Sequence, residues 1–132
     1  MAMKLRKWSG EVKDLKAYPS SIMDDELSVL ANSVTAANYD FIRTLSDNNY
    51  VLEIGCGVNS FIKESIKEKQ WEGIDVFEKN SYGIPTIATK IASVEYIPFE
   101  NETFDFVISN QSIEHWNEYG VSLKDALNEI IR

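Results

Sequence analysis

The residues best suited to chemistry are a carboxylate and two glycines near the middle of the chain. Glu53 stands two residues before Gly55, and Gly57 follows two residues later. Because glycine has no Cβ and tolerates left-handed backbone, such a turn lets a ligand approach bare peptide N–H groups. Glu53 is flanked by apolar residues, where an unpaired charge is costly, so it should point at those N–H groups or brace the loop. This pattern predicts a nucleotide-like cofactor.

Other candidate side chains lie further along the chain. Asp75 ends a second apolar run, and Ser109 and Asn110 end a third. His115, the only histidine, could act as a general base, and it could equally be a packing residue. Cys56, the single cysteine, cannot form an internal disulfide, which fits a reducing cytoplasm. We interpret Cys56 as a small turn residue rather than a nucleophile.

The apolar pattern predicts the elements that must position these residues. A buried strand should lead into the glycine turn, and a helix should follow it and return the chain to a parallel neighbouring strand. The last strand is apolar on both faces, which is typical of the middle of a helix-covered parallel sheet. The sequence predicts strands at residues 51–54, 71–76, 86–91 and 104–109, and helices at residues 24–45, 60–69 and 123–131.

Several motifs over residues 50–132, in order and at suitable spacing, resemble class I S-adenosylmethionine-dependent methyltransferases, notably their small-molecule branch. They are E-x-G-x-G at 53–57, Gly-Ile-Asp-Val at 73–76, the segments 92–99 and 101–109, and Ile-Glu-His-Trp at 113–116. The resemblance implies an α/β fold, a Rossmann-like three-layer sandwich with a mostly parallel sheet. That fold has seven strands ordered 3-2-1-4-5-7-6, of which this chain supplies strands one to four.

The resemblance also implies a domain organisation. Residues 24–132 are expected to be the N-terminal, cofactor-binding half of a truncated methyltransferase-like domain, and residues 1–23 an extension before it. In such a half, the strand at 104–109 would have an exposed edge, which is an aggregation hazard. We therefore expect that edge to be covered by a homodimer partner or by the N-terminal helix.

The cofactor that the resemblance implies is S-adenosylmethionine. Asp75 would accept both ribose hydroxyls, and Glu53 would reach the methionyl amine through water. Ser93 stands where the family usually has an acid that contacts adenine. The expected cofactor-binding residues are Glu53, Gly55, Cys56, Gly57, Asp75, Val76, Ser93, Val94, Ser109 and Asn110. Asn110 and His115 would lie nearest the chemistry, and no metal site is expected.

Composition limits the possible partners. The formal charge is −8; residues 1–16 carry a net +3 and residues 17–132 a net −11. An acidic body argues against nucleic acid, and no apolar run approaches the roughly 18 to 20 residues of a membrane span. These observations favour a small-molecule methyl acceptor.

Three alternatives remain open. A degenerate S-adenosylmethionine-binding domain that acts through a partner would bind the cofactor without turnover. A dinucleotide oxidoreductase is disfavoured because Ser60 stands where the third glycine of G-x-G-x-x-G should be. A pure interaction domain would bind neither cofactor.

Overall fold

The computed structural model describes residues 36–67, 70–110 and 112–132. These residues belong to two compact units, with residues 36–45 in one and residues 46–132 in the other. The first contains a helix over residues 36–44, within the helix predicted at 24–45. The predicted boundary between residues 23 and 24 lies outside the described residues, so that division stays a prediction.

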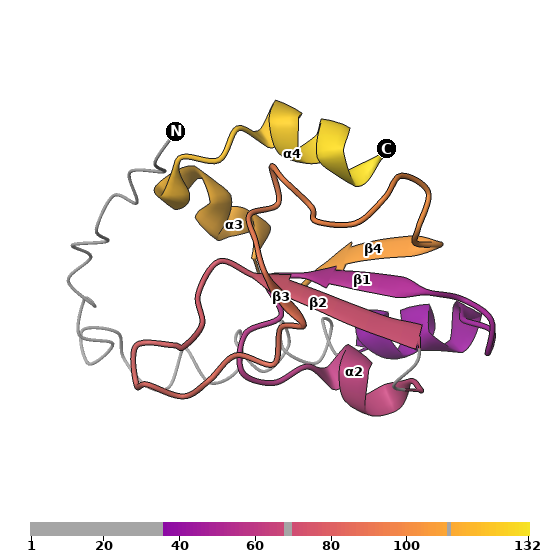
Figure 1. Ribbon diagram of the computed structural model, residues 1–132. Coiled ribbons are helices and arrows are strands. Elements are labelled where there is room, and N and C mark those ends of the chain that lie inside the picture. The colour runs from indigo at the N-terminus through magenta and orange to yellow at the C-terminus, as the bar shows by residue number, and fades with distance from the viewer. Residues whose placement is uncertain (1–35, 68–69, 111) are drawn as a thin grey trace, which may run out of the picture. The chain divides into compact units, whose positions relative to one another are not determined.

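The second unit is built on a four-stranded parallel sheet in the order β3-β2-β1-β4 (Figure 1). Its central strand β1 pairs with β2 and β4 over its whole length. The order is that of the first four strands of the expected fold. The strands are β1 (Val51–Ile54), β2 (Trp71–Asp75), β3 (Lys90–Ile91) and β4 (Phe106–Ser109).

Helices cover both faces of this sheet. One face carries α2 (Phe61–Ser65), and the opposite face carries α3 (Ile113–Trp116) and α4 (Leu123–Ile130), as Figure 1 shows. A short 3₁₀ helix, η3 (Asn117–Tyr119), follows α3 directly. Parallel strands joined by crossovers need helices on both faces to bury them. The expected Rossmann-like α/β architecture is therefore confirmed.

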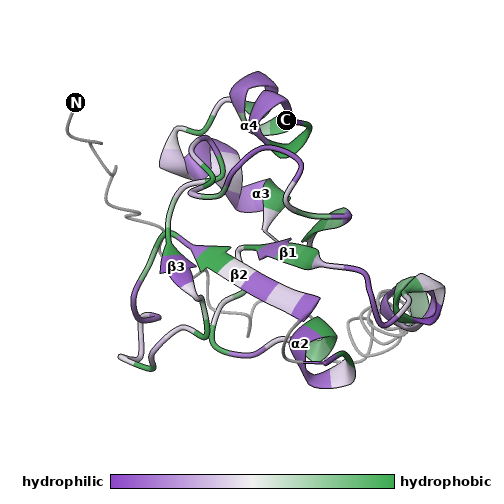
Figure 2. Cartoon of the chain, turned by 45° about the vertical axis from the view of Figure 1, so that its right-hand side comes forward, coloured by the Kyte–Doolittle hydropathy of each residue, from purple (hydrophilic) through white to green (hydrophobic). Residues whose placement is uncertain are grey.

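The core lies between β1, β2 and the helices α3 and α4. All four residues of β1 are buried, and Figure 2 shows this strand coloured mainly as hydrophobic. Its Leu52 and Ile54 side chains pack in one cluster with Ile74 of β2, Trp116 of α3 and Ala126 of α4. Burying each large apolar side chain contributes about 1.5 to 3 kcal/mol, so β1 is the structural centre of the unit.

The third strand is shorter than the sequence predicts. Only Lys90 and Ile91 pair with β2, whereas a strand was expected over residues 86–91. Thr86 and Ile87 instead donate hydrogen bonds to the carbonyl oxygen of Gly57, so this part of the chain follows the glycine turn rather than the sheet.

The helix predicted at 60–69 is also shorter and ends at Ser65. Ile66 has extended backbone, with φ −119° and ψ 167°, which stops the helical hydrogen bonding. The side-chain amide of Gln70 donates to the carbonyls of Ser46 and Asn49 and so directs the chain into β2. Tertiary hydrogen bonds thus override the local helical pattern.

The strand β4 lies at an edge of the described sheet rather than in its middle. Its four residues are each half-buried. An apolar edge strand offers unpaired N–H and C=O groups to a further strand. A homodimer partner or the N-terminal helix over this edge stays a prediction.

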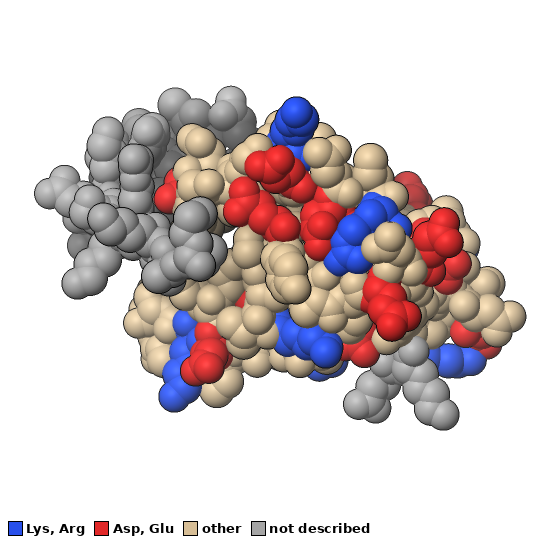
Figure 3. All heavy atoms as spheres, turned by 45° about the horizontal axis from the view of Figure 1, so that its top comes forward, with Lys and Arg blue, Asp and Glu red and all other residues tan. Residues whose placement is uncertain are grey.

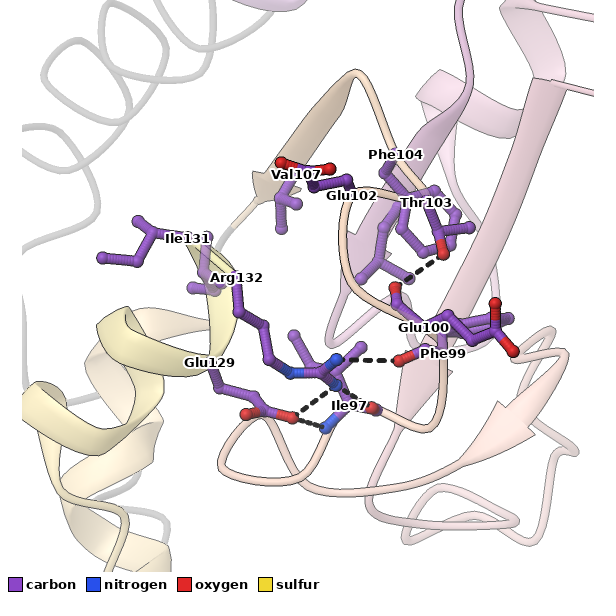
Figure 4. A pocket seen from close by; sticks show the side chains of 12 residues that line it. Ile97, Phe99, Glu100, Glu102, Thr103, Phe104, Val107, Glu129, Ile131 and Arg132 are labelled. Atoms are coloured by element: carbon purple, nitrogen blue, oxygen red, sulfur yellow. Dashed lines mark hydrogen bonds and ion pairs between the residues drawn. The ribbon is translucent and has the colours of Figure 1, made fainter.

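A charged clamp fixes the end of α4. The Arg132 guanidinium donates to the carbonyl oxygens of Ile97 and Phe99 and to the carboxylate of Glu129. Glu129 in turn accepts the N–H of Ile97, and the neighbouring Arg132 lowers the pKa of Glu129. Figure 4 shows these groups beside a hollow of about 300 Å³ with Leu52 and Val107 among its walls. None of the predicted site residues lines it.

Candidate functional site

The glycine turn after β1 is held against the end of β2. Gly55 and Gly57 both have left-handed backbone, with φ of +69° and +63°. The N–H groups of Gly55 and Cys56 donate to the carbonyl oxygen of Ile74, and the N–H of Gly57 donates to the Asp75 carboxylate at 2.9 Å. Only glycine adopts such backbone without strain, which explains both positions.

The two glycines differ in what surrounds them. A Cβ on Gly55 would lie 2.4 Å from the Cβ of Ser112, a buried residue whose hydroxyl donates to the carbonyl of Ile54. A Cβ on Gly57 would meet nothing within 4 Å. Gly55 therefore lets the start of α3 pack on the turn, whereas Gly57 leaves the backbone open on its free side.

Asp75 ends β2 and is half-buried beside the turn. One of its carboxylate oxygens accepts the N–H of Gly57, and the other accepts the N–H of Phe77 at 3.1 Å. Each carboxylate oxygen has two lone pairs, so both oxygens can accept a further hydrogen bond. Asp75 thus shapes the turn and can still hold a ligand hydroxyl.

Glu53 is 3% exposed, and one of its oxygens accepts hydrogen bonds from the Ser60 hydroxyl at 2.5 Å and the Trp71 indole at 2.9 Å. The expectation that it points at the N–H groups of the turn is wrong, because Ile74 and Asp75 accept those groups. Burial raises the pKa of Glu53, and the two hydrogen bonds oppose that shift. The Glu53 carboxylate therefore braces the loop, which was the second of the two interpretations of this residue from the sequence.

Two hollows share Gly55 as a lining residue. The first, about 190 Å³, is mainly apolar and has Asp75 among its lining residues. Five further expected residues line it, together with three aromatic residues that were not among the expected cofactor-binding residues. The expected ones are Gly55, Val76, Ser93, Val94 and His115, and the aromatic ones are Phe77, Trp116 and Tyr119.

The second hollow, about 420 Å³, is mainly polar. Two acidic residues, Glu53 and Glu64, and Asn110 line it. It is also lined by Gly55, Cys56, Asn59, Ser60 and Phe61. A hollow with this lining suits a ligand group that carries charge, whereas the apolar one suits a flat ring.

The structure separates the two residues expected nearest the chemistry. Asn110 lines the polar hollow and His115 the apolar one. His115 is half-exposed, and its Nδ1 lies 3.1 Å from a carboxylate oxygen of Glu118. Ser109 lines neither hollow, and its hydroxyl is hydrogen-bonded to that of Ser112.

Sequence reasoning did not assign a role to Ser112, Trp71 or Tyr119. Ser112 meets Gly55 across the turn, Trp71 reaches Glu53 from the start of β2, and Tyr119 comes from η3. No local pattern marks these contacts, because each joins segments distant in sequence. Ser60 carried a signal that could have been used: a serine just before a helix is a typical N-cap, and its hydroxyl accepts the N–H of Lys63.

The Cys56 thiol should be nearly unreactive in the folded chain. Burial, with the nearby Asp75 charge, raises its pKa to about 12, and the side chain is 4% exposed. Iodoacetamide at pH 8 should therefore alkylate it at least about 10³-fold more slowly than in guanidinium-unfolded chain. Mass spectrometry of timed samples measures this ratio, and equal rates would contradict the burial of the thiol.

The described residues include no group of three or more His, Cys, Asp or Glu side chains arranged to hold a metal ion. None of the helices in that part of the chain has the length and apolar character of a membrane span. On the face that carries α3 and α4, Asp and Glu outnumber Lys and Arg, as Figure 3 shows.

Comparison with known proteins adds one finding. A family model described as a methyltransferase domain matches residues 52–132, which is more than half of the chain. No curated protein and no solved structure matches. The matched region contains the sheet except its first residue, Val51, together with the glycine turn and both hollows. The chain belongs to the methyltransferase domain family.

Proposed function

We propose that this chain binds S-adenosylmethionine and forms the cofactor-binding part of an enzyme that methylates a small-molecule nucleophile. The observation that carries the proposal is the pair of hollows that share Gly55 in their lining, one mainly apolar and one mainly polar. S-adenosylmethionine has a matching division, with adenosine at one end and a charged amino acid at the other.

The apolar hollow fits the adenosine end. Val94 and Trp116 offer apolar surface to a purine, and Ser93 can hydrogen-bond its edge. Asp75 would accept the ribose hydroxyls with the lone pairs that its two backbone partners leave free. A carboxylate at this place would repel a 2′-phosphate, which favours an unphosphorylated ribose.

The polar hollow fits the amino-acid end. Glu53 and Glu64 supply negative charge for an ammonium group, and the Asn110 amide can donate to a carboxylate. Gly55 lines both hollows, so the part of a ligand that joins its two ends would lie against the backbone of the glycine turn. The residues present therefore fit both ends of the cofactor.

The bound cofactor would supply a methyl group already activated by a positively charged sulfur, so the protein's main task is alignment. His115 can assist by accepting a proton from an oxygen or nitrogen acceptor at Nε2 while its Nδ1 stays paired with Glu118. The acidic face over α3 and α4 disfavours a polyanionic acceptor and supports a small molecule. We also propose a cytoplasmic location, since the one cysteine is a free thiol.

Calorimetric titration of the full chain with S-adenosylhomocysteine, with NAD as comparator, tests the proposal. We expect saturable binding of S-adenosylhomocysteine and none of NAD at the same concentrations. Preferential binding of NAD would support the dinucleotide alternative. Binding of neither compound by folded chain would favour an interaction domain and contradict the proposal.

One observation favours a second candidate, a cofactor-binding domain that does not catalyse. Asn110 and His115 line different hollows, so the described residues do not present them to one reacting centre. Such a domain would bind S-adenosylhomocysteine as tightly as an enzyme does and would transfer no methyl group to any acceptor in a radiolabel screen.

A further inference from the structure

Two of the residues that line the polar hollow, Glu53 and Ser60, belong to a row of hydrogen bonds that ends on a single oxygen of Glu53. The backbone N–H of Lys63 donates to the Ser60 hydroxyl at 3.0 Å, and that hydroxyl donates to Glu53 Oε2 at 2.5 Å. The indole N–H of Trp71 donates to the same Oε2 at 2.9 Å. Three elements, α2, β1 and β2, thus meet at one carboxylate oxygen.

All three side chains in this row are deeply buried. Glu53, Ser60 and Trp71 are 3%, 6% and 4% exposed. A buried carboxylate is costly unless it is hydrogen-bonded, and these two donors reduce that cost. Because both act on Oε2, they also fix the rotation of the carboxyl group. Glu53 lines the polar hollow, and because both donors act on Oε2, Oε1 is the oxygen that can accept from a ligand there.

The Trp71 indole is itself held in place from two sides. A Cβ on Gly73 would lie 2.3 Å from the ring, so the ring packs directly on the bare backbone of β2. On another side, the Lys63 ammonium lies 4.8 Å from the ring centroid, within cation–π distance. The indole N–H is therefore a preorganised donor and cannot readily turn away from Glu53.

We propose that Ser60 and Trp71 are positioning residues that turn Glu53 Oε1 toward the ammonium group of an amino-acid ligand in the polar hollow. The inference rests on the proposed function, which places the methionyl part of the cofactor there. It goes further in assigning the orientation of the acid to a serine and a tryptophan outside the glycine motif. Glu64 is the other carboxylate of this hollow, and it is exposed and lies on α2.

Two ligands that differ only in the amino-acid part test the inference. S-adenosylhomocysteine carries the ammonium group, whereas 5′-methylthioadenosine keeps the adenosine and the sulfur and lacks it. Trp71→Phe removes the indole N–H and keeps an aromatic ring, and Ser60→Ala removes the hydroxyl. In calorimetric titrations, each of these two variants should bind S-adenosylhomocysteine about tenfold more weakly than the wild-type chain does. Its affinity for 5′-methylthioadenosine should stay within about twofold of the wild-type value.

Three controls accompany these variants. Glu53→Gln should show the full loss of preference for S-adenosylhomocysteine, and adding Trp71→Phe to it should cause no further loss. Lys67→Ala removes the exposed ion pair with Asp47, and Lys67 lines neither hollow, so the preference should be retained. Circular dichroism confirms that each variant is folded.

The outcomes separate the inference from the proposed function. If Trp71→Phe and Ser60→Ala weaken both ligands equally, or neither ligand, the two residues do not position Glu53 and the inference fails alone. If folded wild-type chain binds neither ligand, the proposed function fails and the inference falls with it. If Trp71→Phe and Ser60→Ala weaken only the binding of S-adenosylhomocysteine, and Trp71→Phe has no further effect once Glu53→Gln is present, both the inference and the proposed function are supported.

Discussion

Replacing Gly55 by alanine should cost about 2 to 5 kcal/mol of stability, whereas the same change at Gly57 should cost only about 1 to 2 kcal/mol. Both residues have left-handed backbone, so both variants carry the strain of an alanine with positive φ. Only at Gly55 would the new Cβ lie 2.4 Å from the Cβ of Ser112. The difference between the variants therefore measures that clash.

Urea unfolding of the two variants, followed by circular dichroism, measures this difference. Against a typical net stability of about 5 to 15 kcal/mol, Gly55→Ala should shift the midpoint strongly and Gly57→Ala mildly. The double variant Gly55→Ala/Ser112→Gly removes the clashing Cβ and should recover part of the loss. Equal costs at the two glycines, or no recovery in the double variant, would contradict the packing of Ser112 on the turn.

The Gly57→Ala variant should also bind a ligand less tightly. The new methyl group of Gly57→Ala would stand on the open side of the turn, where no protein atom lies within 4 Å. If a cofactor approaches the backbone there, this mildly destabilised variant should lose at least about tenfold in affinity for S-adenosylhomocysteine. Unchanged affinity would mean that the ligand does not approach that side of the turn.

The second large effect is expected at Asp75. Asp75→Ala should lower the affinity for S-adenosylhomocysteine by about 100-fold or more, since it removes the acceptor that we propose for two ribose hydroxyls and frees the N–H groups of Gly57 and Phe77. Asp75→Asn keeps an acceptor oxygen but loses the charge, so its loss should be about tenfold. Calorimetric titration of the three proteins gives both ratios.

Asp105 provides a matched control for this series. Its carboxylate also accepts a backbone N–H, that of Tyr50 at 2.7 Å, but it lines neither hollow. Asp105→Ala should lower the unfolding free energy by about 1 to 2 kcal/mol and leave ligand affinity unchanged. Equal losses of affinity in Asp75→Ala and Asp105→Ala would show that the effect at Asp75 is only structural.

The strands that carry the site could be predicted because their signal is local. The apolar runs at β1, β2 and β4 are short and bounded by turn residues, and the predicted and observed ranges agree to within two residues at each end. The third strand and the helix at α2 were predicted too long. Their ends depend on hydrogen bonds from Thr86 to Gly57 and from Gln70 to Ser46 and Asn49, which no local pattern encodes.

The sequence by itself determined the parallel α/β sheet, the glycine turn and the acid at the end of β2, since each follows from residue type and spacing over a few positions. Only the tertiary structure decided which side chains meet around them. Ser112 reaches Ile54 across 58 residues, and Trp71 reaches Glu53 across 18. Such contacts arise when parallel strands and their crossovers bring distant segments to one edge of the sheet, so the division of the site into two hollows could not be predicted from local pattern.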